Sequence, residues 1–460
     1  MNKTLKFPSN FTFAVADADL QVVGEDFTIK EEGSEPTMWK DFAQELGKVY
    51  KNTPPGVAVD RYHKWPQDIE IMKELGISEY RTSVSMARTL KKDGSVNEKA
   101  IKWYRDYFKS LNKAGIKVYA TLYHWELPLY LHEIGGWKHA RTIKVFEEHA
   151  HTVARELGDL IEEYFILNEP WCSSLLSYYH GIHAPGETDL KGALQASHNL
   201  LLAQGKAFRA IKSIHKSAKI STVFNIEPAF AKTGDKKDLD AARYYNGYFN
   251  WWFLDPVYLG RYPDYMLDLY GKKAPKFTDE EMSIIKIGPD MHSLGINYYL
   301  GRIVEYDEIN ELKFRCVDLK GSERNDLGWV IFVPPKYPKA FTNILSDIYH
   351  SYKHFGLKKI YITENGLALK TPWDKKSRSV SDDRRISYYK RHISQVYDAI
   401  VKGVPVEKYF LWTLMDNYEW AQGFRPKSCF GIIHVDRKTL KRVWKMSARW
   451  YRRLVKSKKL

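Results

Sequence analysis

Two carboxylates, each at the end of a short apolar segment, are the residues of this sequence best suited to chemistry. Glu169 ends the segment Tyr-Phe-Ile-Leu-Asn-Glu and is followed by Pro170, while Glu364 ends Lys-Ile-Tyr-Ile-Thr-Glu and is followed by Asn-Gly. Each segment is typical of a buried strand that stops at its glutamate. A charged side chain rarely ends a buried strand unless it is paired or functional. The two motifs therefore predict paired carboxylates in one pocket, the arrangement that cleaves glycosidic bonds.

Strand-like segments alternate with helical patterns along the whole chain. Strands are expected at residues 11–16, 78–84, 117–124, 163–168, 219–225, 293–299, 359–363 and 408–414. The clearest helical periodicity lies between them, at residues 140–155, 194–213 and 387–402. Such alternation favours a parallel sheet, and eight strands favour a closed barrel. We therefore predict an α/β fold, a single-domain (β/α)8 TIM barrel over residues 1–460 with long βα loops.

The composition is that of a large globular protein. The 460 residues are 44% hydrophobic and 28% charged, and the aromatic content of 14% suits a sugar-binding cleft. Lys and Arg (71) exceed Asp and Glu (56), which gives a net charge of +15. Such a surface attracts anions, but the basic residues are spread along the chain except at its C-terminal end. We expect no nucleic-acid partner.

The cysteine pattern and the apolar segments indicate the compartment. Cys172, Cys316 and Cys429 are too few and too scattered for a disulfide framework or a zinc site, and their odd number is typical of reduced thiols. Cys172 is expected to be a small buried residue. No segment reaches the ~20 apolar residues of a membrane helix, and the first residues lack a signal-peptide pattern. We expect a cytoplasmic protein without membrane contact, metal or nucleotide cofactor.

Polar and aromatic side chains follow the predicted strands. In a barrel of this kind the active site lies at the carboxyl ends of the strands. The residues at or just beyond these ends are Gln21, Arg81, His124, Asn168, Asn225, Asn297, Tyr299, Trp412, Glu419 and Trp420. Amides, carboxylates and an imidazole suit sugar hydroxyls, and indoles suit the faces of sugar rings. The strand ends therefore predict a carbohydrate-binding pocket.

The sequence resembles glycoside hydrolase family 1, a family of retaining β-glycosidases with a (β/α)8 barrel. The resemblance runs from Phe7 to Tyr451 and is carried by the two glutamate motifs together with Tyr-His-Trp at 123–125, His-Ala-Pro-Gly at 183–186 and Asn-Tyr-Glu-Trp at 417–420. It implies hydrolysis of β-glucosides, and of β-galactosides or β-fucosides, by double displacement. A small glycoside would be the partner, and a homo-oligomer is compatible with the sequence.

The resemblance also implies roles for five residues. Glu169 would be the general acid/base, and Glu364 would be the nucleophile that forms a glycosyl-enzyme. Arg81 would keep Glu364 ionised, Tyr299 would donate to it, and Asn168 would bind the sugar 2-hydroxyl. The negative charge of one carboxylate should raise the pKa of the other.

The same resemblance implies the residues that bind substrate. Gln21, His124, Asn297, Glu419 and Trp420 would bind sugar hydroxyls, Trp412 would stack on the ring, and Trp329 would contact the aglycone. Structural alternatives stay open: an ion pair elsewhere for Arg81 or Glu419, and core packing for Tyr299, His124, Trp329 and Trp412. Glu419 would repel a sugar 6-phosphate, which favours unphosphorylated substrates, although Lys427 and Ser428 nearby leave the phosphorylated alternative open.

Several positions depart from the family pattern. Asp17 and Asp19 stand where small neutral residues are usual, Met86 replaces a Trp, and residues 425–429 form an altered loop. None of these changes removes a catalytic group. Two rival functions remain, a non-catalytic carbohydrate-binding protein and a transglycosidase that uses an acceptor other than water.

Overall fold

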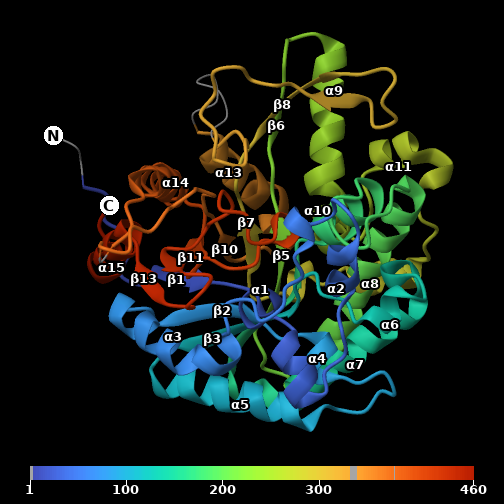
Figure 1. Cartoon of the computed structure of the whole chain (residues 1–460). Helices are drawn as coiled ribbons and strands as arrows, with labels where there is room; N and C mark the ends of the chain where they lie inside the picture. The colour runs from blue at the N-terminus through green and yellow to red at the C-terminus, as the bar shows by residue number, and fades with distance from the viewer. Residues whose placement is uncertain (1–3, 332–338, 378) are drawn as a thin grey trace.

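The computed structural model describes residues 4–331, 339–377 and 379–460. Within these residues eight parallel strands close into a barrel in the order β1-β11-β10-β7-β5-β4-β3-β2. Helices surround the barrel (Figure 1), so the predicted (β/α)8 fold is confirmed. The barrel strands are β1 (Thr12–Ala16), β2 (Glu79–Ser83), β3 (Lys117–Tyr123), β4 (Ile161–Asn168), β5 (Ile220–Asn225), β7 (Leu294–Asn297), β10 (Ile360–Glu364) and β11 (Val406–Trp412).

Each of the eight predicted strands corresponds to one barrel strand, with bounds that differ by a few residues. The three predicted helices are also present, as α7 (Ala140–Leu157), α8 (Leu190–Ile214) and α14 (Asp383–Val401). The longer α-helices that complete the outer layer are α3 (Arg61–Leu75), α5 (Glu98–Lys113), α13 (Ala340–Tyr352) and α15 (Met446–Ser457). The shorter ones are α1 (Asp19–Val23), α2 (Met38–Gln44), α4 (Met86–Thr89), α6 (Leu129–His132), α9 (Lys236–Asn246), α10 (Trp252–Leu259), α11 (Asp264–Tyr270) and α12 (Asp279–Ile285).

Alternating side chains on the strands build two cores. One set points inward and fills the barrel, with Tyr119, Phe165, Val223 and Phe410 among its members. The other set packs against the surrounding helices in a much larger cluster. The alternation follows from the period of two along a strand. The filled interior makes the barrel a rigid support for the residues at its carboxyl end.

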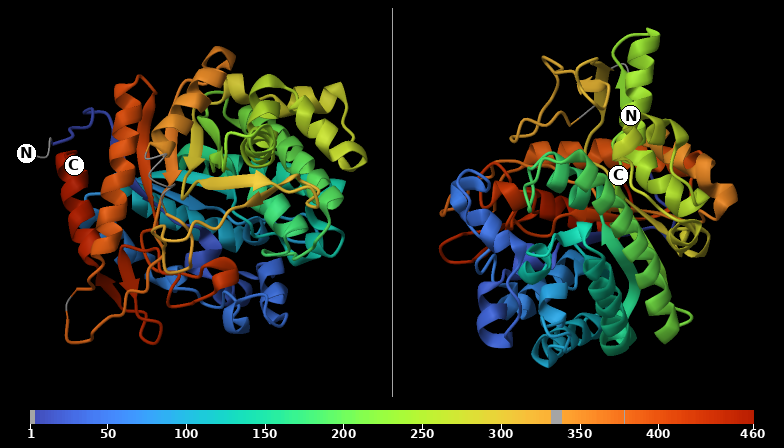
Figure 2. Two further views of the ribbon diagram at one scale, coloured as in Figure 1. Left: turned by 90° about the horizontal axis from the view of Figure 1, so that it is seen from above. Right: turned by 90° about the vertical axis from the view of Figure 1, so that its right-hand side faces the viewer.

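Insertions after the fifth and sixth barrel strands lengthen the loops at the carboxyl end of the barrel, in agreement with the long βα loops expected from the sequence. The chain between β5 and β7 contains β6 (Ala229–Ala231) and α9, and the chain after β7 contains β8 (Arg302–Tyr306) and β9 (Phe314–Cys316). β6, β8 and β9 form a separate small sheet. Figures 1 and 2 show α9 and this sheet rising beside each other above the barrel. A further two-stranded sheet, β12 (Ile433–Val435) with β13 (Arg442–Trp444), follows β11.

Buried ion pairs explain the two unusual aspartates after β1. Asp17 lies 3.1 Å from the Arg61 guanidinium and also accepts from Thr82 at 2.9 Å. Asp19 lies 2.8 Å from the guanidinium of Arg88. Each aspartate is at most 3% exposed, so these cations offset its desolvation. The two aspartates therefore attach the loop after β1 to the elements around β2.

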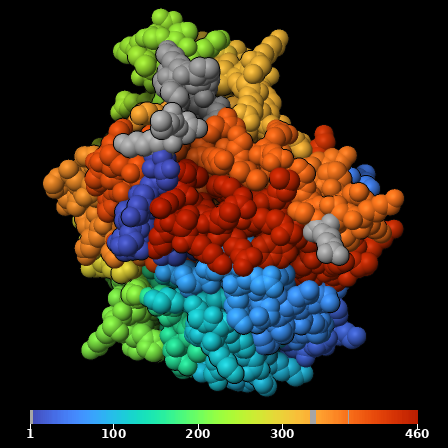
Figure 3. Space-filling model, turned by 90° about the vertical axis from the view of Figure 1, so that its left-hand side faces the viewer, coloured from blue at the N-terminus to red at the C-terminus, as the bar shows by residue number. Residues whose placement is uncertain are grey.

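The two ends of the described chain lie together. The N–H of Phe7 donates to the carbonyl of Lys458 at 3.0 Å, and the N–H of Leu5 donates to the carbonyl of Leu460 at 3.0 Å. Figure 3 shows the N-terminal segment, in blue, lying against the C-terminal part of the chain, in red. In the described ranges, no helix has the length and apolar character needed to cross a membrane.

Candidate active site

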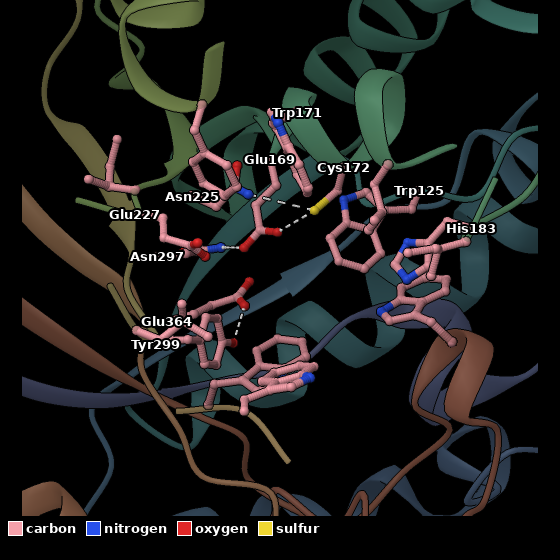
Figure 4. A pocket seen from close by; sticks show the side chains of 18 of the residues that line it. Trp125, Glu169, Trp171, Cys172, His183, Asn225, Glu227, Asn297, Tyr299 and Glu364 are labelled. Carbon is pink, nitrogen blue, oxygen red and sulfur yellow. Dashed lines mark hydrogen bonds between the residues drawn. The ribbon is translucent and has the colours of Figure 1, made fainter. Parts of the chain in front are cut away.

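A cavity of about 460 Å³ opens at the carboxyl end of the barrel (Figure 4). Its volume is that of a small-molecule binding site. The predicted site residues that line it are His124, Glu169, Asn297, Tyr299, Trp329, Glu364, Trp412, Glu419 and Trp420. Three other predicted residues lie directly behind its wall: Arg81, Asn168 and Gln21, all completely buried.

Strand register brings the two glutamates to one space. Glu169 follows the last residue of β4, and Glu364 is the last residue of β10. Asn297, at the end of β7, pairs in register with Glu364 and with Asn225 of β5. Figure 4 shows the two carboxyl groups pointing into the same cavity from opposite sides, with Asn297 beside them. The side-chain amide of Asn297 donates to Glu169 Oε1 at 2.6 Å.

A cation and a phenol hold Glu364. Arg81 Nη1 donates to Glu364 Oε1 at 2.7 Å, and the Tyr299 hydroxyl donates to Oε2 at 2.7 Å. Burial raises the pKa of Glu364, whereas the Arg81 charge and these hydrogen bonds oppose the rise. A carboxylate that accepts from a guanidinium and a phenol is favoured in its ionised form. Glu364 is therefore the first of the two carboxyls to ionise.

Glu169 accepts from neutral donors alone within the described parts of the chain. Asn297 donates to its Oε1, and the Cys172 thiol donates to its Oε2 at 3.0 Å. Burial and the nearby negative charge of Glu364 raise the pKa of Glu169 to about 8. The structure thus gives the two carboxyls different environments, one that stabilises the anion and one that stabilises the acid.

Strained backbone positions occur at the cavity. Glu169 has φ = 51°, Trp125 has φ = 80° and Trp420 has φ = 48°, values that non-glycine residues rarely adopt. Each costs on the order of 1–3 kcal/mol and is retained where the surrounding structure fixes it. For Glu169 the N–H donates to the Val223 carbonyl at 2.9 Å, and its own carbonyl accepts from Cys172 N at 2.9 Å. These bonds direct the Glu169 side chain into the cavity.

Asn168 connects residues of the cavity wall to the residues that hold the two glutamates. Its Oδ1 accepts from Arg81 at 2.7 Å and from Asn297 at 3.0 Å, and its Nδ2 lies 3.1 Å from His124 Nε2. His124 Nε2 therefore accepts, which places the proton of the neutral ring on Nδ1. Burial and the Arg81 charge lower the pKa of His124 well below its usual value, so the ring is neutral. The buried Nδ1 has no hydrogen-bond partner among the described residues, and it is available to a ligand hydroxyl.

The remaining predicted residues form the floor and rim. Trp412 stacks on His124 with ring centroids 5.7 Å apart, and Trp420 also stacks on His124, with ring centroids 5.8 Å apart. Glu419 Oε2 lies 3.4 Å from Gln21 Nε2, which donates mainly to the Tyr418 carbonyl at 2.7 Å. Burial and the charges of Glu364 and Glu169 raise the pKa of Glu419. Trp329, 39% exposed, lies at the outer edge.

Sequence reasoning missed most of the outer wall. These lining residues include Trp171, Cys172, Glu227, Tyr245, Phe249 and Arg302. Glu227 accepts hydrogen bonds from Tyr245 and Arg302. Trp171 and Cys172 stand two and three places after Glu169, a proximity that was a usable signal. Arg302 lies on β8, outside the barrel, and no local pattern indicated it.

Within residues 4–331, 339–377 and 379–460, no three His, Cys, Asp or Glu side chains converge in a group that could hold a metal ion. The cavity presents a pair of carboxyls, amides and aromatic rings to a ligand.

Removal of the Arg81 charge should both destabilise the protein and raise the pKa of Glu364. In Arg81→Met the buried Glu364 carboxylate loses its cation, so the free energy of unfolding should fall by about 3–5 kcal/mol. The acid limb of the kcat/KM profile should move to higher pH. Urea denaturation and a pH profile measure the two effects.

Tyr299→Phe is the matched control for that variant, because it removes one neutral donor to the same carboxylate at 2.7 Å and leaves the cation in place. Its loss of stability should be smaller, on the order of 1–3 kcal/mol. Equal effects of the two variants would show that the Arg81 charge does not control Glu364.

A barrel with two carboxyls in contrasting environments, at the mouth of a cavity lined by aromatic rings and amides, defines the class of glycoside hydrolases. The family model described as "Glycosyl hydrolase family 1" matches residues 3–460. The chain belongs to glycosyl hydrolase family 1, which confirms the resemblance seen in the sequence.

Characterised relatives agree over nearly the full length. The chain is 35% identical over 456 residues to "Beta-glucosidase A" of Acetivibrio thermocellus, covering 98% of this chain and 99% of that protein. It is 35% identical over 450 residues to "Beta-glucosidase" of Agrobacterium sp., covering 97% and 94%. Among solved structures, "Family 1 b-glucosidase from Thermotoga maritima" superposes with a TM-score of 0.93 at 34% identity, covering 100% of each chain.

Proposed function

We propose that this protein is a retaining β-glucosidase that hydrolyses unphosphorylated β-glucosides, and related β-galactosides or β-fucosides, with Glu364 as nucleophile and Glu169 as acid/base. One observation carries the assignment of roles. Glu364 accepts from the Arg81 guanidinium at 2.7 Å, whereas the two donors that the structure gives Glu169, an amide and a thiol, are neutral. Membership of family 1 and the relatives named β-glucosidases support the substrate class.

The first step forms a glycosyl-enzyme. Glu364 attacks the anomeric carbon, the bond from that carbon to the glycosidic oxygen breaks, and Glu169 gives its proton to the leaving oxygen. Because its pKa is about 8, the Glu169 carboxyl is protonated at neutral pH and can supply this proton. Arg81 and Tyr299 each donate to one oxygen of Glu364 and so fix its carboxylate at the cavity.

The second step releases the sugar. Once the charge of Glu364 is consumed in the ester, the pKa of Glu169 falls, since that charge is one cause of its rise. Glu169 then takes a proton from water, the oxygen of which attacks the anomeric carbon and displaces Glu364. Two displacements restore the β configuration.

The charge of the cavity supports an unphosphorylated substrate. Glu419 lines the cavity together with Glu169 and Glu364, and a third carboxyl there repels a phosphate group. Two residues had left the phosphorylated alternative open. Ser428 lines a different cavity, and Lys427 lines neither of these two cavities as far as the described residues show.

We infer a reducing compartment and a single folded unit. Cys172, Cys316 and Cys429 are all free thiols, which fits the cytoplasmic location expected from the sequence. The barrel uses strands from Thr12 to Trp412, and α15 packs against α14 and α3. This closure of the chain on itself supports one domain.

A panel of nitrophenyl glycosides tests the proposed function. Nitrophenol release from the β-glucoside, and little from the α-glucoside or the β-glucoside 6-phosphate, is expected. Tight binding of glucosides without nitrophenol release would favour a carbohydrate-binding protein instead. Faster release with added alcohol, together with alkyl glucoside as the main product, would favour a transglycosidase.

A further inference from the structure

The thiol of Cys172 occupies a defined place beside the acid/base carboxyl. Its Sγ donates to Glu169 Oε2 at 3.0 Å, and its N–H donates to the Glu169 carbonyl at 2.9 Å. Cys172 begins the helical segment Cys172–Tyr179, three residues after Glu169. Glu169 lies just before the helix, and the bond from Cys172 N–H to its carbonyl closes a turn that brings the thiol next to the Glu169 side chain. Cys172 is 6% exposed and lines the catalytic cavity.

A second contact orients the thiol. Asn225 Nδ2, at the end of β5, donates to Cys172 Sγ at 3.7 Å. Because the amide hydrogen takes one side of the sulfur, the S–H is directed toward Glu169. Figure 4 shows this sequence of contacts from Asn225 through Cys172 to Glu169, with Asn297 on the opposite carboxyl oxygen. Burial and the charge of Glu169 raise the pKa of the Cys172 thiol, which keeps its proton.

We propose that Cys172 is a positioning residue that orients the Glu169 carboxyl in both steps of the reaction, as a partner to Oε2 that can reverse its hydrogen bond. This proposal rests on the proposed function. Glu169 must be an acid in the first step and a base in the second. Its Oε1 accepts from the Asn297 side-chain NH2 at 2.6 Å, a group that can donate but not accept. The acidic proton therefore belongs on Oε2.

A thiol suits the position beside Oε2 because it is both a weak donor and a weak acceptor. While Oε2 carries the acidic proton, the sulfur competes little with the glycosidic oxygen for it. After that proton has left, the S–H donates to the carboxylate. The same contact thus holds Glu169 in place without fixing its protonation state.

Two substitutions separate this role from simple packing. Cys172→Ala removes the partner of Oε2, so the basic limb of kcat/KM should move up by about 0.5–1 pH unit. For an alkyl glucoside, kcat should fall about tenfold with little change in KM. Cys172→Ser keeps a donor and should return kcat toward the wild-type value, with the basic limb at or below the wild-type position. Cys429→Ala is the control, because Cys429 lies outside the catalytic cavity and its Sγ is within hydrogen-bond distance of the Pro426 carbonyl at 3.5 Å.

A second readout does not depend on turnover. Infrared or ¹³C NMR titration of the resting enzyme, with the Glu169 signal assigned by Glu169→Gln, should show the same upward shift in Cys172→Ala and none in Cys429→Ala. If the wild type hydrolyses no glycoside but the titration of Glu169 shifts in Cys172→Ala, the proposed function fails and the contact between Cys172 and Glu169 stands. The positioning role is overturned if Cys172→Ala changes neither the basic limb of kcat/KM nor the titration of Glu169. It is also overturned if this variant slows nitrophenyl and alkyl glucosides equally.

Discussion

Glu364→Ala should reduce the turnover of β-glucosides by a factor on the order of 10⁴ or more, the scale of loss seen when an enzyme nucleophile is removed. Without Glu364 no glycosyl-enzyme can form, and water has no base on that side of the sugar. The expected measurement is kcat for nitrophenyl β-glucoside in the variant and in the wild type.

Added azide or formate should restore turnover in Glu364→Ala. Either anion fits the space left by the side chain and attacks from the same face, so azide should yield the α-glucosyl azide, inverted relative to the substrate. The matched control is Glu323→Ala, which removes an exposed carboxylate 2.7 Å from Arg391 and should leave kcat unchanged. Unchanged activity in Glu364→Ala, or rescue that gives the β-azide, would exclude Glu364 as nucleophile.

The loss of activity in Glu169→Ala should depend on the leaving group of the substrate. Alkyl glucosides need a proton on the departing oxygen, so their kcat/KM should fall by about 10²–10⁴. Dinitrophenyl glucoside leaves as a stable anion, so its kcat/KM should change little, while slow release of the sugar limits kcat. A burst of dinitrophenol in stopped-flow traces measures this accumulation. Equal losses on both substrates would contradict the acid role.

The pH profile gives an independent view of the same residue. The first step needs protonated Glu169, so kcat/KM should fall as pH rises through the pKa of about 8. It should also fall at low pH, as Glu364 becomes protonated. In Glu169→Ala the basic limb should disappear for dinitrophenyl glucoside and the acid limb should remain.

The barrel, and the position of two glutamates in one cavity, were accessible from the sequence because both follow from local patterns. Short apolar segments with the length typical of strands predicted β4 and β10. The glutamate at the end of each segment indicated a pair of carboxyls. Parallel barrel strands carry the site at their carboxyl ends, and this rule predicted that the two glutamates lie in one site. Glu169 and Glu364 are far apart in sequence, yet no side-chain detail was needed to bring them together.

Contacts between distant elements were not accessible in this way. Asp17 and Asp19 looked anomalous until the structure placed Arg61 and Arg88 against them, 44 and 69 positions further along the chain. Cys172 illustrates the same limit, since its burial was predicted but its bond to Glu169 was not. That bond depends on the rotamer of one side chain and on the positive φ of Glu169, which periodicity does not encode.

Glu364 should become covalently bound to the sugar during turnover. Incubation with a dinitrophenyl 2-deoxy-2-fluoro-β-glucoside, which slows both steps but keeps a good leaving group, should trap the intermediate. Peptide mass spectrometry should then find one fluoroglucosyl group on the peptide that contains residues 359–366, with fragmentation locating it at Glu364. A label on Glu169 or Glu419, or rapid turnover to the α-anomer with no label, would contradict the role of Glu364 as nucleophile.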